Sequence, residues 1–150
     1  MTQSTNQPTI PVRLIQLLSV AGLLVAFYLW LFHEGVLIAA CSGGGWDDCG
    51  AVSGPNAPFA TIGPISVALL GLLGYAGIFL LTWLSDWLSP VQDNLTELLL
   101  GLTGLGFLFS LALTGLEAFV IHAFCRFCLI SAAIMTTMFG LAIVHWHQQR

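Results

Sequence analysis

Four long apolar stretches, separated by shorter polar segments, dominate the sequence. A helix rises about 1.5 Å per residue, so each stretch is long enough to cross a hydrocarbon core of about 30 Å. Within lipid, only helices and closed barrels satisfy the hydrogen bonds of the backbone. We therefore predict an all-α membrane protein, a bundle of four transmembrane helices. The helices are expected at about residues 14–33, 65–85, 95–121 and 125–146.

The polar segments define the rest of a single membrane domain spanning residues 1–150. Residues 1–12 are polar, uncharged and interrupted by two prolines, which is typical of a flexible tail. Residues 34–63 form the one long polar segment, rich in glycine, proline and asparagine. A loop of this length is more often functional than idle. We expect it to connect the first and second helices.

The amino-acid composition also indicates a membrane protein, and it limits the kinds of partner that we expect. Hydrophobic residues make up 57% of the chain and charged residues 7%, whereas soluble domains carry roughly a quarter charged residues. The net charge of −4 arises from few charges, and nothing in the sequence indicates binding of nucleic acid. The partners expected from composition are therefore lipid and whatever meets the polar loop.

The four cysteines fall into two close pairs. Cys41 and Cys49 lie in the long loop, and Cys125 and Cys128 form a C-x-x-C motif where the last apolar stretch begins. Four spans place that loop and the start of the fourth helix on the same side of the membrane. An even number of paired cysteines is typical of an oxidising compartment.

The basic residues predict the orientation. Arg13 and Arg150 lie with the two termini, and Arg126 lies on the opposite side. Because cytoplasmic segments carry an excess of basic residues, we predict cytoplasmic termini. The cysteines and the long loop are then extracytoplasmic.

Each cysteine pair has a structural alternative. The loop pair fits a disulfide that staples a glycine-rich segment. The C-x-x-C pair fits a staple poorly, because closing so short a loop removes little unfolded-state entropy. Structural zinc sites favour short spacing in both halves, and the wider spacing of the loop pair departs from this, so we expect no metal. Two dithiols at one membrane edge favour a relay by thiol–disulfide exchange, which ends on a lipid-soluble quinone.

These features together resemble the bacterial branch of the vitamin K epoxide reductase family. The resemblance runs from the first helix to the middle of the fourth. The matching positions, in chain order, are Cys41, Cys49 and Ser53 in the loop, Gly63-Pro64-Ile65-Ser66 with Gly71 and Tyr75, Leu116-Glu117, and Cys125, Cys128 and Ser131-Ala132.

The resemblance implies an enzyme that reduces menaquinone or ubiquinone with electrons from a thioredoxin-like protein. Cys125 and Cys128 match the active-site pair, with Cys128 implied to face the quinone, and Cys41 and Cys49 match the shuttle pair. In bacteria this implies oxidation of a DsbA-like protein at the inner (cytoplasmic) membrane, and hence disulfide formation in exported proteins. Some bacterial relatives carry a fused thioredoxin-like domain, whereas here we expect the thioredoxin-like partner to be a separate protein.

Other residues are assigned to the quinone site as expectations. Ser53, Ser66 and Tyr75 are assigned on the resemblance alone. Animal members carry a tyrosine after the C-x-x-C motif where this chain has Ser131-Ala132-Ala133, which argues against reduction of vitamin K epoxide itself.

Glu117 and His122 are candidates from the residues themselves. An ionisable group inside a membrane span is a functional candidate by default. We expect Glu117, or His122 near it, to hydrogen-bond the quinone or to pass it a proton. The alternative for Glu117 is an acid that snorkels toward the interface or is held by an interhelical hydrogen bond. Arg126 either lowers the pKa of a neighbouring thiol by its charge or anchors the chain at the interface.

Two other functions stay open at this point. A DsbB-type oxidase catalyses the same overall reaction with four helices, but its C-x-x-C lies in the first external loop. A non-enzymatic tetraspan scaffold with structural disulfides would hold cysteines that do not respond to quinone.

Overall fold

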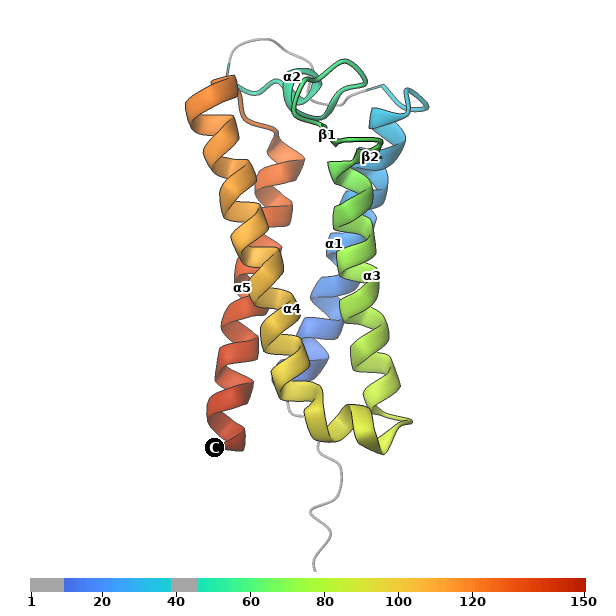
Figure 1. The fold of residues 1–150 in the computed structure, drawn as a ribbon, viewed down its shortest axis with the longest axis vertical. Coiled ribbons are helices and arrows are strands. Elements are labelled where there is room, and N and C mark those ends of the chain that lie inside the picture. The colour runs from blue at the N-terminus through green and yellow to red at the C-terminus, as the bar shows by residue number, and fades with distance from the viewer. Residues whose placement is uncertain (1–9, 39–45) are drawn as a thin grey trace, which may run out of the picture.

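The computed structural model describes residues 10–38 and 46–150 of the chain. Four helices run along the long axis of the molecule (Figure 1). They are α1 (Ile10–His33), α3 (Val67–Ser85), α4 (Ser89–Leu116) and α5 (Arg126–Gln149), and α4 continues directly as the π-helix η1 (Glu117–Ile121). All four are long and apolar enough to cross a membrane, which confirms the predicted four-helix bundle and an integral membrane protein.

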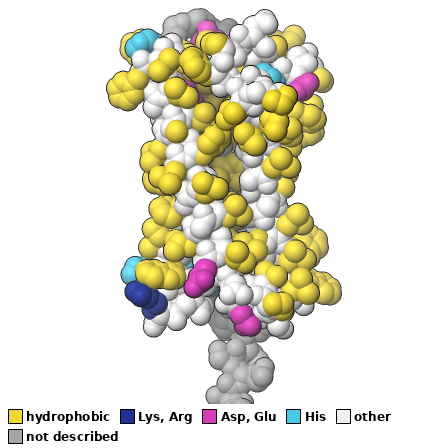
Figure 2. Space-filling model, viewed as in Figure 1, with side chains coloured by type: hydrophobic (Ala, Val, Ile, Leu, Met, Phe, Trp, Pro, Cys, Tyr) yellow, Lys and Arg dark blue, Asp and Glu magenta, His cyan; other side chains and the backbone are white. Residues whose placement is uncertain are grey.

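The helices form one bundle in which α1 packs against α3 and α5, and α4 packs against α5 and α3. Hydrophobic side chains cover the outer surface along its length, and charged and histidine side chains lie near the two ends (Figure 2). Many of the exposed residues are leucine, valine, isoleucine and phenylalanine. An outer surface of this kind suits contact with lipid rather than with water.

Two helices begin earlier than the apolar pattern predicted. Helix α1 starts at Ile10, inside the expected tail, and α4 starts at Ser89 rather than near residue 95. Pro11 and Pro90 occupy the first turns of these helices, where the missing N–H of proline costs nothing. The first turn of α4 is exposed and partly polar, whereas that of α1 is mostly apolar and includes the buried Pro11 and Val12. The start of a charge-free apolar stretch therefore does not mark the start of either helix.

The long loop contains regular structure that the sequence did not predict. It holds the short helix α2 (Cys49–Ser53) and the strand β1 (Thr61–Ile62), which pairs antiparallel with β2 (Ile65–Ser66). Gly63 lies in the turn between the strands with φ +64°, a left-handed conformation that glycine adopts without strain. The hairpin and α2 lie over the same end of the bundle (Figure 1).

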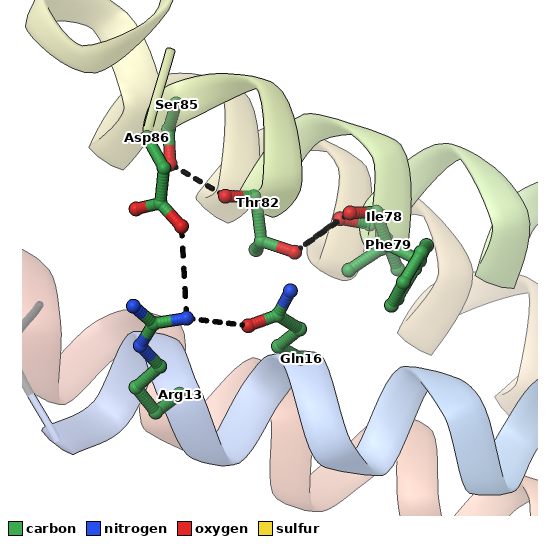
Figure 3. A network of polar contacts seen from close by, with 7 residues as sticks. All are labelled: Arg13, Gln16, Ile78, Phe79, Thr82, Ser85 and Asp86. Atoms are coloured by element: carbon green, nitrogen blue, oxygen red, sulfur yellow. Dashed lines mark hydrogen bonds and ion pairs between the residues drawn. The ribbon is translucent and has the colours of Figure 1, made fainter.

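A polar network links the helices at the opposite end (Figure 3). Arg13 Nη1 donates to Gln16 Oε1 at 3.1 Å and lies 3.6 Å from Asp86 Oδ2. Asp86 belongs to the turn between α3 and α4. Thr82 and Ser85 donate to carbonyls of their own helix. The charged groups therefore stay at the end of the bundle, outside its apolar middle.

A close approach between α1 and α3 sets the position of the Tyr75 ring. A Cβ atom on Gly22 would lie 2.2 Å from Cε1 of the Tyr75 ring, so only glycine leaves room for the ring there. Tyr75 is 2% exposed as a result, and its hydroxyl reaches across to α5. The tight contact is therefore made by a glycine of α1.

Candidate active site

Two cysteines from distant parts of the chain face each other at the α2 end of the bundle. The sulfurs of Cys49 and Cys125 lie 3.3 Å apart, and the two side chains are 1% and 0% exposed. No two of the three described cysteines are at the disulfide-bond distance of about 2.05 Å. Cys41 lies outside the described residues. The structure thus brings one loop cysteine, Cys49, to the first cysteine of the C-x-x-C motif.

Local structure explains how Cys49 is delivered. Asp48 caps α2, because its Oδ1 accepts a hydrogen bond from the Ala51 N–H at 3.2 Å. Cys49 is the first residue of that helix and packs in a small apolar cluster with Leu29 and Phe32 of α1. The cluster seals the sulfur pair from water.

Cys125 and Cys128 carry free thiols and share a hydroxyl partner. Ser53 Oγ lies 3.3 Å from Cys128 Sγ and 3.9 Å from Cys125 Sγ. The pKa of Cys125 lies below its usual range because the Cys128 side chain hydrogen-bonds its sulfur, an effect that outweighs burial, and Ser53 adds to it. The lowered pKa favours the thiolate form of Cys125, and the thiolate is the form that takes part in exchange.

We expect alkylation of Cys125 in the fully reduced protein to titrate below the pKa of about 8.5 of an ordinary thiol. Cys128→Ala removes the largest stabilising hydrogen bond, so the midpoint should move upward, and Ser53→Ala should move it upward by less. The rate of carbamidomethylation of the Cys125 peptide, followed by mass spectrometry from pH 5 to 10, measures this. A midpoint that stays the same in Cys128→Ala would contradict the assignment.

Beside the thiols lies a cavity of about 160 Å³ enclosed by α1, α3, α4 and α5. Its wall is mostly apolar, and Gly71 and Gly74 of α3 form part of it. Cys128 lines this cavity, whereas Cys125 does not. The polar groups that line it, besides Cys128, are Ser53, Tyr75, Glu117, Ser131, His33, Ser110 and Thr114. An apolar pocket with a few convergent polar groups is the usual form of a small-molecule site.

Glu117 is buried at the junction between α4 and α5. Its side chain is 3% exposed, it lines the cavity, and its Oε2 accepts the backbone N–H of Cys125 at 3.2 Å. Glu117 is also the first residue of η1, and π-helical turns occur often at functional sites. The interhelical hydrogen bond that the sequence left as an alternative is thus present, on a residue that also reaches the cavity.

Tyr75 lies deeper in the cavity wall. Its hydroxyl donates to the Ser131 carbonyl at 2.9 Å and lies 2.8 Å from Ser131 Oγ. This pair connects α3 to α5 one turn beyond Cys128. Ser131 is therefore part of the site through Tyr75.

Two residues assigned to the quinone from the sequence lie elsewhere. Ser66 does not line the cavity, because its hydroxyl caps α3 by accepting the Leu69 N–H at 3.2 Å. His122 does not line it either, since its side chain is exposed and its backbone ends η1 in the left-handed conformation, with φ 55°. Neither residue lies on the wall of this cavity, and their assignment to the quinone stays a prediction.

Arg126 contacts the end of the long loop. Its guanidinium Nη2 lies 2.6 Å from Asp47 Oδ2. The two roles expected for Arg126, at a neighbouring thiol and at the membrane interface, stay predictions.

Sequence reasoning missed His33, which closes the cavity from α1. Its Nδ1 lies 3.2 Å from the Gly54 carbonyl oxygen and 3.4 Å from that of Ser53. Carbonyls only accept, so Nδ1 carries the proton and holds the end of α2 against α1. The sequence signal was a histidine at the end of an apolar stretch, which is a common position for histidine at a membrane interface.

The chain was compared with known proteins. No curated protein matches it. Residues 13–143 match the sequence model of the vitamin K epoxide reductase family, which covers most of the chain and all four helices. Together with two free thiols between a loop cysteine and an intramembrane cavity, this match leads to one conclusion. The chain belongs to the vitamin K epoxide reductase family, a family of membrane thiol–disulfide oxidoreductases that use quinones.

Proposed function

We propose that the protein oxidises a separate thioredoxin-like protein of the DsbA type and passes the electrons to a membrane quinone. One observation carries the proposal: Cys125 faces the loop cysteine Cys49, while Cys128 lines the cavity. Each thiol of the C-x-x-C motif then serves a different side of the reaction. The outcome would be disulfide formation in exported proteins.

The contact between Cys49 and Cys125 supports exchange between the two pairs. In the relay, the Cys49 thiolate attacks the Cys125 sulfur of an oxidised Cys125–Cys128 pair, that bond breaks, and Cys128 leaves as a thiolate. Cys41 then displaces Cys125 from Cys49, which restores the loop disulfide and leaves both helix thiols reduced. The partner protein reduces the loop disulfide again. The part of Cys41 rests on the sequence, and that of Cys49 on the 3.3 Å contact.

The cavity fits a quinone head group. Its apolar wall suits a flat ring, and its volume, below the roughly 300–1,000 Å³ of common ligand pockets, suits the ring rather than a whole isoprenoid molecule. A bound quinone accepts two electrons and two protons for each dithiol oxidised. Ser53 supplies a hydroxyl that orients a carbonyl-bearing ring, and Tyr75 lines the cavity while its own hydroxyl is bonded to Ser131. Glu117 supplies a carboxyl that holds or releases a proton. Menaquinone and ubiquinone share the groups that these residues recognise.

The orientation proposed from the sequence is retained. Arg126 lies at the end of the bundle that holds the cysteines, whereas Arg13 and Arg150 lie at the other end. We propose that the cysteine end faces outward from the bacterial cytoplasmic membrane, where a thioredoxin-like partner meets it.

The test is thiol-driven quinone reduction by the purified protein in lipid nanodiscs. A reduced thioredoxin-like protein is the donor, and soluble ubiquinone and menaquinone analogues are the acceptors. We expect one quinone reduced for every two donor thiols lost. A protein whose thiols do not respond to either quinone would be a scaffold with structural disulfides, and the proposal would fail.

A further inference from the structure

The end of the long loop is paired with the connection that leads into α5. The Phe124 N–H donates to the Trp46 carbonyl at 2.7 Å, and the Asp48 N–H donates to the Phe124 carbonyl at 3.1 Å. These bonds form an isolated parallel bridge between Asp47 and Phe124. The bridge fixes the register of the two segments, one residue before Cys125 and two before Cys49.

A single ion pair joins the same two segments through side chains. Asp47 Oδ2 accepts a hydrogen bond from Arg126 Nη2 at 2.6 Å. The neighbouring Asp48 instead caps α2 by accepting the Ala51 N–H. The Asp47 carboxylate therefore pairs with α5, whereas the Asp48 carboxylate caps α2.

The docked arrangement hides the sulfurs that it brings together. Cys49 is 1% and Cys125 0% exposed, so their exchange depends on residues 46–49 staying packed against the start of α5, which we call the docked position. A surface contact that holds this segment raises the fraction of molecules in which the two sulfurs meet. The ion pair is such a contact, since the side chains of Arg126 and Asp47 are 67% and 41% exposed.

We propose that Asp47 and Arg126 are positioning residues that hold Cys49 against Cys125 for thiol–disulfide exchange. The inference rests on the proposed relay from Cys49 to Cys125. The ion pair acts on the fraction of molecules in which the loop is docked, and not on the thiols themselves. Because both charges face solvent, its effect weakens as salt screens them.

The effective concentration of Cys49 at Cys125 measures the docked fraction directly. The full-length protein carrying Cys41→Ser and Cys128→Ser is equilibrated with glutathione buffers of graded redox ratio. The fraction linked between Cys49 and Cys125 is then read by peptide mapping. Asp47→Asn should lower the effective concentration by roughly 1.5- to 5-fold at low salt, the range of an exposed ion pair. At 1 M salt the difference should shrink toward none.

Two variants serve as controls. Asp48→Asn removes an equal charge from the adjacent residue but keeps a good helix cap, so it should leave the effective concentration unchanged. Arg126→Lys keeps the positive charge and should retain most of the effective concentration. Arg126→Gln should lower the effective concentration as much as Asp47→Asn does. An unchanged value in Asp47→Asn, or an equal loss in Asp48→Asn, would overturn the inference. Failure of the proposed function would instead appear as absent thiol-driven quinone reduction in the unsubstituted protein, with the effective concentration still measurable.

Discussion

Replacing Cys128 with alanine is expected to abolish thiol-driven quinone reduction, by on the order of a thousandfold or more. Cys128 is the thiol of the C-x-x-C pair that lines the cavity, so its loss separates the sulfur chemistry from the quinone site. Cys125 would remain beside Cys49 at 3.3 Å and could still form a mixed disulfide. Quinol formation by the purified variant, driven by dithiothreitol or by a reduced thioredoxin-like protein, measures the effect.

Cys49→Ala provides the contrast. This variant should lose oxidation of the protein partner and keep most of the reduction driven by dithiothreitol, which is small enough to reduce the C-x-x-C pair directly. The two variants together assign Cys49 to the partner side and Cys128 to the quinone side. If Cys49→Ala lost the dithiothreitol-driven reaction as completely as Cys128→Ala, this division between the thiols would be wrong.

Glu117→Gln is expected to lower quinone turnover by roughly 10²–10⁴-fold, the usual contribution of a positioned acid or base. The glutamine amide oxygen can still accept the Cys125 N–H, so the start of α5 should keep its geometry. What is lost is the ionisable group at the cavity wall. Turnover as a function of pH should accordingly lose the dependence that the carboxyl gives to the unsubstituted protein.

Glu117→Leu separates the structural part of this residue from the chemical part. Leucine leaves the Cys125 N–H buried without an acceptor, which costs about 1–3 kcal/mol, so thermal unfolding in detergent should shift downward. Glu117→Gln should unfold close to the unsubstituted protein. Quinone turnover of Glu117→Gln that is unchanged across pH would remove Glu117 from the chemistry and leave it as a structural contact.

The four spans and the clustering of the cysteines were predictable because they depend on length, hydropathy and parity. Residues that cross lipid must be apolar in long runs, and an even number of spans fixes which loops share a side. The helix starts at Ile10 and Ser89 were not predictable in this way. Prolines beside them suggested a tail and a turn, yet proline fits the first turn of a helix.

The sequence predicted the described cysteines of the site, but only some of the residues around them. That Cys49 faces Cys125 depends on α2, whose position is set by contacts with distant segments. The same holds for the pairing of Asp47 with Arg126, since residues so far apart in sequence carry no local signal of each other.

Serine and histidine were the least predictable residues. Ser66 looked like a ligand but caps α3, a role that serine fills at many helix starts. His122 lies near Glu117 in sequence, yet the left-handed turn that ends η1 leaves its side chain in solvent. His33 reaches the site because α1 ends beside α2, which no periodicity in α1 could show.

Trapping of mixed disulfides tests most directly whether electrons pass from Cys49 to Cys125. Variants that each lack one cysteine are incubated with and without quinone, quenched with acid and alkylating reagent, and their linked peptides mapped. We predict a Cys49–Cys125 link that accumulates when Cys41 or Cys128 is absent. A link from Cys41 to Cys125, or no link between the loop and the C-x-x-C motif, would contradict the relay.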